Sequence, residues 1–362
     1  MTAPARRVAW RVVRRVFEDD AYADRAFASE ARNLDDRDRA LAQRIAYGTV
    51  QRVRTIDHGI ESLGRRPVRK LDPPVRAALR IAGYELAWSE APAHAVADDA
   101  VELVREAKLE RATAFTNAVV RRLAQGFRGL VASLPEGALK HSYPDWIEEV
   151  WVRDWGEEEA FALERAQNEP PELEEYRGMS RGSRLAAEVV GSQPGERVLD
   201  ACAAPGNKTL LLAGEVTAVE VNEGRARLLR ERMPESVHVV NADVRELSER
   251  GFDRALVDAP CSGLGVLNRR PDLRWRARPL PELQLELLRA AIERVRPGGT
   301  VVYSVCTLNA DENEAVVDAS GLEPVPLDAE WPQYAHPTRP EFLLTLPHRD
   351  RTSGFFIARL KS

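Results

Sequence analysis

The sequence predicts a multidomain chain, with an all-α helical bundle followed by an α/β domain built on a doubly wound parallel sheet. Two observations support this prediction. The chain has 362 residues, more than one small core requires. Near residue 180 the hydrophobic pattern also changes, from the helical period to short β-branched runs that alternate with helices.

Composition excludes several classes of protein. Hydrophobic residues make up 44% and charged residues 30%, as in an ordinary globular chain rather than a disordered one. There is neither a membrane-length apolar run nor an N-terminal signal peptide, so we expect a cytoplasmic protein. The three cysteines lack a C-x-x-C spacing and the six histidines are scattered, which predicts no disulfide framework and no metal site.

Charge is distributed unevenly along the chain. Residues 1–140 contain 25 Lys and Arg against 19 Asp and Glu, a net charge of +6. The remaining residues contain 27 against 38, a net charge of −11. A basic domain joined to an acidic one fits a module that binds a polyanion such as RNA. The alternative is that these arginine-rich helices only expose a solvated surface, which would give the same excess of positive charge.

The first 135 residues show helical periodicity throughout. In residues 71–88, Asp72 is placed to cap a helix, Pro73 suits its first turn, and apolar side chains recur on one face. The same period returns at residues 5–17, 36–53, 95–108 and 113–124. We therefore expect a helical bundle over residues 1–135.

Residues 136–179 are expected to form a helical linker. Helical patterns cover residues 143–155 and 157–167, and Pro170 and Pro171 then interrupt any regular structure. The α/β domain is expected to span the rest of the chain, from residue 180 to residue 362.

Strand and helix patterns alternate in this last part. The expected strands are residues 197–202, 217–221, 237–240, 254–260 and 300–305, and the helices between them are residues 207–214, 222–233 and 281–295. Doubly wound sheets bind ligands beyond the carboxyl ends of their strands. Cys202, Cys261 and Cys306 each lie at or just past such an end, so we expect them to line one crevice.

The segment "DACAAPGNKT" (200–209) joins a strand to a helix through small residues, which let backbone amides approach a ligand. It matches neither the dinucleotide nor the P-loop pattern, so NAD and ATP are not expected. Glu220 lies at the end of the next strand, where an acid commonly binds ribose hydroxyls, and Asp243 ends the third and could reach an adenine amine. The structural alternatives are that residues 200–209 form only a tight turn, and that Glu220 and Asp243 only cap helices.

Two further segments carry reactive or cationic residues. "DAPCSGLG" places Asp258, Pro260 and Cys261 where a strand leaves for a loop. "NRRPDLRW" (268–275) then supplies arginines and a tryptophan suited to phosphates and stacked bases. A solvated loop with one packing tryptophan is the alternative.

Together with "YSVCTLNADENE" (303–314), these motifs resemble those of the Nol1/Nop2/Sun family of RNA cytosine-5 methyltransferases. The helical first domain resembles the antitermination factor NusB. The combination is similar to the branch that modifies a cytosine of bacterial 16S ribosomal RNA. Two departures are Asn207, where the family usually has glycine, and "SVC" for the common S-T-C. A third is the short "ELEEYRGMS" (172–180), which stands where the family has a small RNA-recognition-like subdomain and is expected to be a truncated form of it.

The resemblance implies a Rossmann-like methyltransferase domain, S-adenosylmethionine as cofactor and RNA, in particular small-subunit ribosomal RNA, as partner. It implies Cys306 as the nucleophile that adds to C6 of cytosine, and Cys261 as the group that assists release. Asp258 would contact the base edge and Lys208 would orient Asp258. A base that reacts in such a crevice must first leave its stack.

The implied cofactor site comprises the loop and the acids that follow the strands: Cys202, Ala203, Ala204, Pro205, Gly206, Asn207, Lys208, Glu220, Asp243 and Asp258. The RNA-binding residues expected from the cationic loop are Arg269, Arg270 and Trp275. No metal is expected, and a monomer is expected.

The acidic residues after Cys306 have a simple explanation, because Asp311, Glu312 and Glu314 would favour the N-terminus of the next helix. We expect this role for Glu312, and leave Asn313 and Glu314 as supports of the site. Two other functions remain open: a non-catalytic RNA-binding or ribosome assembly factor, and the same chemistry on transfer RNA.

Overall fold

The computed structural model describes residues 2–170 and 178–362. The segment expected to be a truncated RNA-recognition-like region, residues 172–180, lies mostly outside the described residues. Among the residues described, no helix combines the length and the apolar character needed to cross a membrane.

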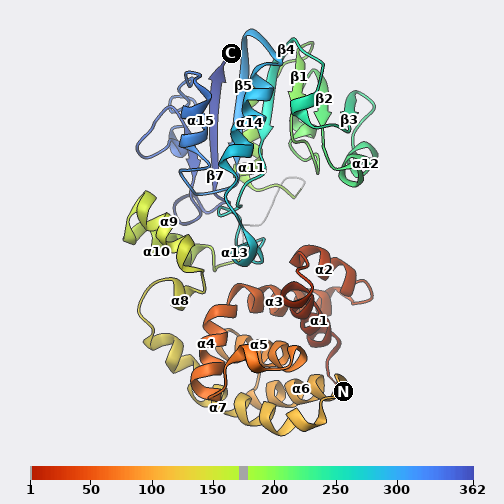
Figure 1. Ribbon diagram of the computed structural model, residues 1–362, viewed down its shortest axis with the longest axis vertical. Coiled ribbons are helices and arrows are strands. Elements are labelled where there is room, and N and C mark those ends of the chain that lie inside the picture. The colour runs from red at the N-terminus through yellow and green to blue at the C-terminus, as the bar shows by residue number, and fades with distance from the viewer. Residues whose placement is uncertain (1, 171–177) are drawn as a thin grey trace. The chain divides into compact units, whose positions relative to one another are not determined.

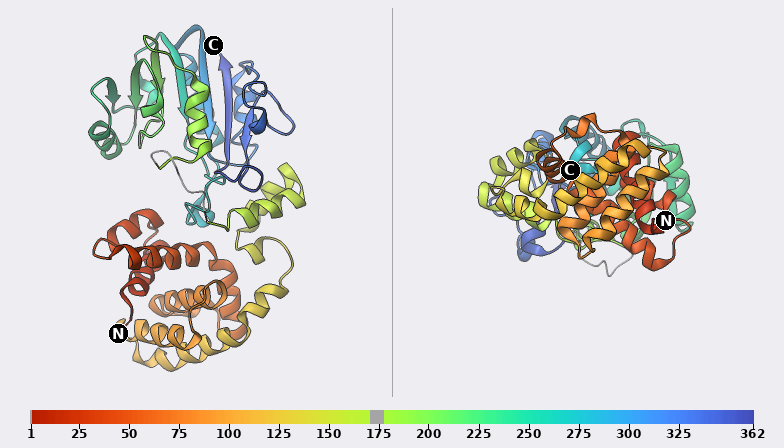
Figure 2. Two further views of the ribbon diagram at one scale, coloured as in Figure 1. Left: turned by 180° about the vertical axis from the view of Figure 1, so that it is seen from behind. Right: turned by 90° about the horizontal axis from the view of Figure 1, so that it is seen from below.

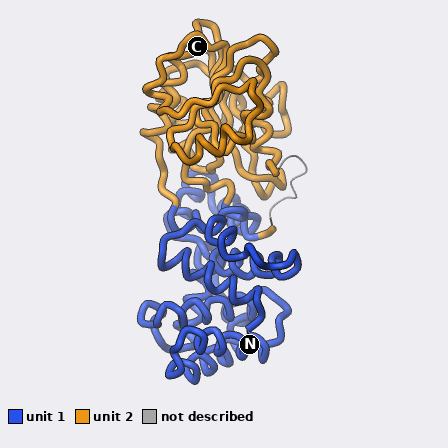
Figure 3. Tube along the Cα trace, turned by 90° about the vertical axis from the view of Figure 1, so that its right-hand side faces the viewer, with its two compact units in different colours: residues 1–168, 267–276 blue, residues 169–266, 277–362 orange. Residues whose placement is uncertain are grey.

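The chain forms two compact units (Figure 3). The first contains residues 1–168 together with residues 267–276, and the second contains residues 169–266 and 277–362. This division differs from the predicted one, in which residues 180–362 form a single continuous domain. Residues 267–276 therefore lie between two stretches of the second unit in the sequence but belong to the first unit in the structure.

The first unit is helical, as predicted (Figure 1). Its longer helices are α1 (Pro4–Glu18), α2 (Ala23–Glu30), α3 (Asp36–Gln51), α4 (Val53–Gly64), α5 (Pro73–Trp88), α6 (Ala93–Glu106) and α7 (Thr113–Ser133). The shorter or later ones are α8 (Ala138–His141), α9 (Asp145–Trp155), α10 (Glu157–Ala166) and α13 (Leu273–Arg276). Helix α5 packs against α1, α3, α4, α6 and α7, and its apolar side chains are buried in the core that these helices share.

The second unit is built on a seven-stranded sheet with the order β3-β2-β1-β4-β5-β7-β6. The strands are β1 (Arg197–Asp200), β2 (Glu215–Val219), β3 (Val237–Val240), β4 (Phe252–Asp258), β5 (Val295–Val305), β6 (Leu343–Thr345) and β7 (Phe355–Lys361). Strands β1 to β5 are parallel, as predicted. The prediction of an all-parallel sheet is wrong at the other edge, where β7 runs antiparallel to both β5 and β6. An antiparallel edge on a mostly parallel sheet is common, and it needs no crossover helix.

Helices cover both faces of this sheet. Figures 1 and 2 show α11 (Arg181–Val190) on one face and α14 (Pro281–Ile292) on the other. Helix α12 (Glu223–Arg232) packs beside β3, and α15 (Glu314–Ser320) packs against α14. The doubly wound α/β fold is thus confirmed. One predicted helix is wrong: of residues 207–214, only Thr209–Leu211 form a 3-10 turn, because the chain must extend again to enter β2.

Candidate active site

Three loops meet at the carboxyl edge of the sheet because the strands before them are neighbours. Strand β4 lies between β1 and β5, and its last residue, Asp258, pairs with Ser304 of β5. The loop after β1 carries Cys202, the loop after β4 carries Cys261, and the loop after β5 carries Cys306. The parallel register therefore gathers the three predicted motifs at one edge.

Asp258 stands between the first and third loops. The Lys208 ammonium donates to Asp258 Oδ2 at 2.7 Å, and the Ser304 hydroxyl donates to Oδ1 at 2.9 Å. Both carboxylate oxygens are thereby held in place. The pairing of Lys208 with Asp258 is the one expected from the sequence, whereas the role of Ser304 was missed.

The thiols of Cys261 and Cys306 lie side by side, with their sulfur atoms 3.5 Å apart. The hydrogen bond between them is the main cause that lowers the pKa of Cys306 and raises that of Cys261. Lys208 also favours the Cys306 thiolate, whereas burial and Asp258 oppose it. Because the thiolate is the nucleophilic form, a lowered pKa suits the nucleophilic role that the sequence resemblance implies for Cys306.

Cys202 stands apart from this pair. Burial raises its pKa, and the surrounding carboxylates, Asp200 first among them, raise it further. A thiol held in its neutral form suits the structural role in the cofactor loop that the sequence predicts for Cys202.

A cavity of about 330 Å³ opens beside these loops and has the size of a small-molecule site. Its walls come from β2, β4, α12, α14 and the loops that follow the strands. The lining residues are Ala201, Cys202, Ala204, Val219, Glu220, Val221, Arg225, Ala242, Asp243, Val244, Arg245, Asp258, Pro260, Leu283 and Leu287. Five of the predicted cofactor residues are among them.

Glu220 is the buried polar group of this cavity, with 4% of its surface exposed. Its Oε1 accepts from the backbone N–H of Asn222 at 2.7 Å and pairs with Arg225 at 2.8 Å. Among the described residues no bond ends on Oε2, which is therefore the oxygen available to a ribose hydroxyl. Asp243 is engaged by Arg245 at 2.7 Å and also caps the turn that follows it.

The loop after β1 encloses a smaller hollow of about 100 Å³, lined in part by Ala203, Pro205, Asn207 and Lys208. Below it Asp200 is almost fully buried and accepts from Thr209 at 2.7 Å. Burial raises the pKa of Asp200 to about 6.

Of the predicted cofactor residues, Gly206 lines neither cavity. Its φ is +95°, and a Cβ at this position would lie 2.6 Å from Leu229 and 2.5 Å from Met233 of the neighbouring helical segment. The glycine is therefore needed to shape the loop.

The cationic segment was predicted to belong to the domain of residues 180–362. In the structure, residues 267–276 belong to the first unit instead. Trp275 packs against the helical core and donates its indole N–H to the Val50 carbonyl at 2.8 Å. Arg270 lies 3.9 Å from Asp24. Trp275 thus serves the packing role that was the alternative, while RNA binding by Arg269 and Arg270 stays a prediction.

The prediction that Glu312 favours the N-terminus of the next helix is wrong. Helix α15 begins at Glu314, and the Glu312 side chain turns inward and is fully buried. Its acidic neighbours in sequence gave no signal of this, because burial depends on the loop after β4 and on α14.

The structure also adds residues that no motif marked. Leu283 and Leu287 of α14 supply an apolar wall of the larger cavity. Their spacing of four residues is ordinary for any amphipathic helix, so the sequence did not distinguish them from core residues.

Comparison with known proteins agrees with this geometry. Residues 187–361 match the family model of the 16S rRNA methyltransferase RsmB/F, and residues 3–125 match that of the NusB family. A Synechocystis protein named probable ribosomal RNA small subunit methyltransferase B is 31% identical over 99% of this chain and 99% of its own. The chain belongs to the RsmB/F family of methyltransferases. The resemblance inferred from the sequence motifs is confirmed.

A second relative supports this assignment, and a solved structure shares the fold. The ribosomal RNA small subunit methyltransferase B of Thermus thermophilus is 34% identical over 90% of this chain and 89% of its own. The solved structure of PH0851 shares the fold, with a TM-score of 0.79 and 22% identity over 100% of this chain and 99% of that one. The alignment with the Synechocystis protein extends over 441 positions, so at least 79 of them have no counterpart among the 362 residues here.

The cofactor of this RsmB/F methyltransferase is S-adenosylmethionine. The larger cavity fits it, since a cationic ligand that carries ribose hydroxyls suits a site with the carboxylates of Glu220, Asp243 and Asp258 and the apolar wall of α14. Among the described residues no group of His, Cys, Asp and Glu is arranged to hold a metal ion.

Proposed function

We propose that this RsmB/F protein methylates C5 of a cytosine in 16S ribosomal RNA through a covalent adduct with Cys306. The observation that carries the proposal is the pair of thiols 3.5 Å apart, with the pKa of Cys306 lowered and that of Cys261 raised. S-adenosylmethionine supplies the methyl group as an electrophile. The names of the relatives support small-subunit ribosomal RNA as the substrate.

Cytosine C5 is a weak nucleophile, and the cysteine changes that. The Cys306 thiolate forms a bond to C6, and the electrons of the C5–C6 double bond become available at C5, which then takes the methyl group. Loss of the C5 proton to a base restores the double bond and expels the Cys306 thiolate. One difficult step is thereby divided into two easier ones.

Besides their effect on the Cys306 sulfur, Asp258 and Lys208 act on the base. Held by Lys208 and Ser304, the Asp258 carboxylate can accept a hydrogen bond from the exocyclic amine of cytosine without reorienting. A fixed acceptor of this kind favours cytosine over uracil, which offers a carbonyl oxygen at the same position. Cys261 assists the departure of Cys306 after the methyl group has been transferred.

Single substitutions of the two cysteines test this mechanism. With RNA transcribed from the 16S gene, Cys306→Ala is expected to abolish both methylation and adduct. Cys261→Ala is expected to retain attack and transfer but to fail in release, so that a protein–RNA band accumulates on a denaturing gel. Normal turnover by Cys261→Ala, or a trapped band with Cys306→Ala instead, contradicts the assignment. Bisulfite sequencing of ribosomal and transfer RNA from a strain without the gene identifies the substrate.

We further propose that the first unit binds RNA through one basic surface. Arg65 and Arg122 line one open hollow, and Arg66, Lys70 and Phe115 contribute to a second one. The four cationic side chains are exposed, and none forms an ion pair among the described residues. Such cations suit RNA phosphates, and the partly exposed Phe115 ring suits a base.

The test for this surface is the double variant Arg65→Ala, Arg122→Ala in the full-length protein. We expect weaker binding to the 16S transcript and a slope of log affinity against log salt that is smaller by about 1.4, the value for two lost phosphate contacts at about 0.7 each. The control removes two exposed arginines from a mixed-charge region, Arg32→Ala and Arg37→Ala. Equal slopes for the two double variants exclude this surface.

A further inference from the structure

The Glu312 carboxylate accepts hydrogen bonds from six donors although it is fully buried. Oε1 accepts from the backbone N–H groups of Ser262 (2.9 Å) and Leu280 (3.1 Å) and from the Gln284 amide (3.0 Å). Oε2 accepts from the hydroxyl of Ser262, the hydroxyl of Thr307 (3.4 Å) and the amide of Asn309 (3.3 Å). A buried carboxylate is tolerated when it is satisfied to this degree.

The donors come from three segments, and two of these carry the reactive thiols. Ser262 directly follows Cys261, and Thr307 directly follows Cys306. The Ser262 and Thr307 hydroxyls also lie 2.7 Å from each other. Glu312 thus joins the residues next to both sulfurs.

The third segment is the start of α14, and it reaches the other side of Cys261. Gln284 donates to Glu312 and also to the carbonyl of Pro260 at 2.9 Å. The residues before and after Cys261 are therefore both tied, directly or through Gln284, to the same carboxylate.

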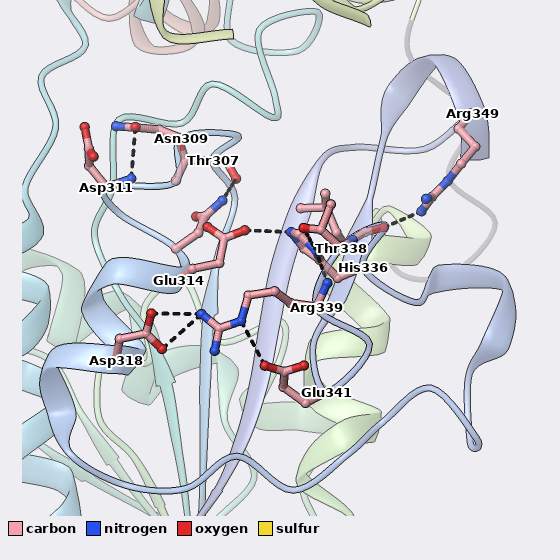
Figure 4. Close-up of polar contacts among 12 residues, drawn as sticks. Thr307, Asn309, Asp311, Glu314, Asp318, His336, Thr338, Arg339, Glu341 and Arg349 are labelled. Atoms are coloured by element: carbon pink, nitrogen blue, oxygen red, sulfur yellow. Dashed lines mark hydrogen bonds and ion pairs between the residues drawn. The ribbon is translucent and has the colours of Figure 1, made fainter. Parts of the chain in front are cut away.

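Glu312 is itself held from two sides. The Tyr303 hydroxyl donates to the Glu312 carbonyl at 2.7 Å, and the Asn313 amide donates to the Thr307 carbonyl at 3.4 Å. Next along the chain, Glu314 pairs with His336 at 2.6 Å, as Figure 4 shows. The turn that carries Glu312 is thus fastened to β5 and to the segment before β6.

We propose that Glu312 is a positioning residue, which holds the two cysteine loops so that the Cys261 and Cys306 sulfurs stay within hydrogen-bonding distance of each other. The proposal rests on the proposed function, because it explains how that thiol pair is kept in place. In Glu312→Gln the side-chain amide would present N–H groups to three of the six donors. In Glu312→Ala all six donors would be left without an acceptor. The pKa of Cys261 is raised chiefly by its hydrogen bond with Cys306 and by burial, and the negative charge of Glu312 raises it further.

Alkylation of the full-length protein tests the proposal without RNA. Iodoacetamide reacts with thiolates, and peptide mass spectrometry gives separate rates for Cys261 and Cys306. At pH 7 the wild-type protein is expected to react faster at Cys306. In Glu312→Gln the ratio of the two rates should fall about tenfold or more, because a change of one pKa unit alters the thiolate fraction tenfold. The matched control is Asp311→Asn, which removes the exposed acid next in sequence and should keep the wild-type ratio.

Methyl transfer to the 16S transcript supplies the second measurement. Glu312→Gln should lower kcat at least tenfold with little change in KM for RNA, and Glu312→Asp should recover part of it. A wild-type ratio of alkylation rates in Glu312→Gln overturns the proposal. If Glu312→Gln does not fold, Ser262→Ala removes one donor, and a ratio unchanged in that variant overturns it equally. An inactive wild-type protein that still shows the alkylation pattern contradicts the proposed function but not the positioning role.

Discussion

Replacing Glu164 by glutamine should make the protein more resistant to alkaline pH. Glu164 lies on α10, is fully buried, and among the described residues neither of its carboxylate oxygens has a hydrogen-bond partner. Burial, followed by the neighbouring carboxyl of Glu148, raises the pKa of Glu164 to about 9. In the unfolded chain the same group titrates near the ordinary value of about 4.3.

The sign follows from which state holds the proton. At neutral pH the folded protein keeps Glu164 protonated, whereas the unfolded chain releases that proton. The stabilising contribution is complete below about pH 4.3 and is lost as pH rises towards 9. Within this window each pH unit costs about 1.4 kcal/mol, so from pH 5.5 to pH 7.5 the group lowers the free energy of unfolding by about 3 kcal/mol.

The assay is urea unfolding of wild type and Glu164→Gln at pH 5.5 and 7.5. Glutamine binds no proton, so any packing cost of the substitution is the same at both pH values. The difference in unfolding free energy between variant and wild type should therefore shift by about 3 kcal/mol in favour of the variant as pH rises. Hydrogen exchange of the α9 and α10 amides locates the effect. The control is Glu149→Gln, at an exposed position of α9. Equal pH dependence of wild type and Glu164→Gln refutes the reasoning.

Three further predictions concern the cofactor site. Glu220→Gln should weaken S-adenosylmethionine binding by roughly 1–3 kcal/mol in calorimetry, the scale for a lost partner of a buried polar group, and unchanged affinity removes Glu220 from the ribose role. Gly206→Ala should lower stability by about 1–3 kcal/mol in thermal unfolding because of its positive φ and the contact with α12, whereas Gly224→Ala, whose Cβ would lie 3.4 Å from the Asn222 side chain, should not. Lys208→Ala should reduce methyl transfer more than tenfold by releasing Asp258, and a wild-type rate would show that the ion pair is dispensable.

Local patterns were enough to predict the architecture. The change of hydrophobic period near residue 180 reflects a real change from helices to strands, and the placement of Cys261 and Cys306 after neighbouring strands predicted that they would meet. Parallel strands end at the same edge of the sheet, so motifs that follow neighbouring strands are expected to lie close together.

Features that depend on distant partners were not predictable in this way. The antiparallel pairing of β7 is decided by which edge of the sheet remains open, and nothing within Phe355–Lys361 records that. Glu312 resembles any acid ahead of a helix until Ser262 and Gln284 are seen to converge on it. The sequence around Trp275 likewise contains no sign that it completes a helical core.

The position of Arg274 has a consequence for the order in which the protein folds during synthesis. Arg274 is almost fully buried in the first unit, where its guanidinium donates to the backbone carbonyls of Gln51, His141, Ser142 and Gln167. On the ribosome, the helices of that unit emerge long before residue 274 is translated. Until then these four acceptors lack the arginine, so the N-terminal unit is completed only after strands β1 to β4 of the second unit have been translated.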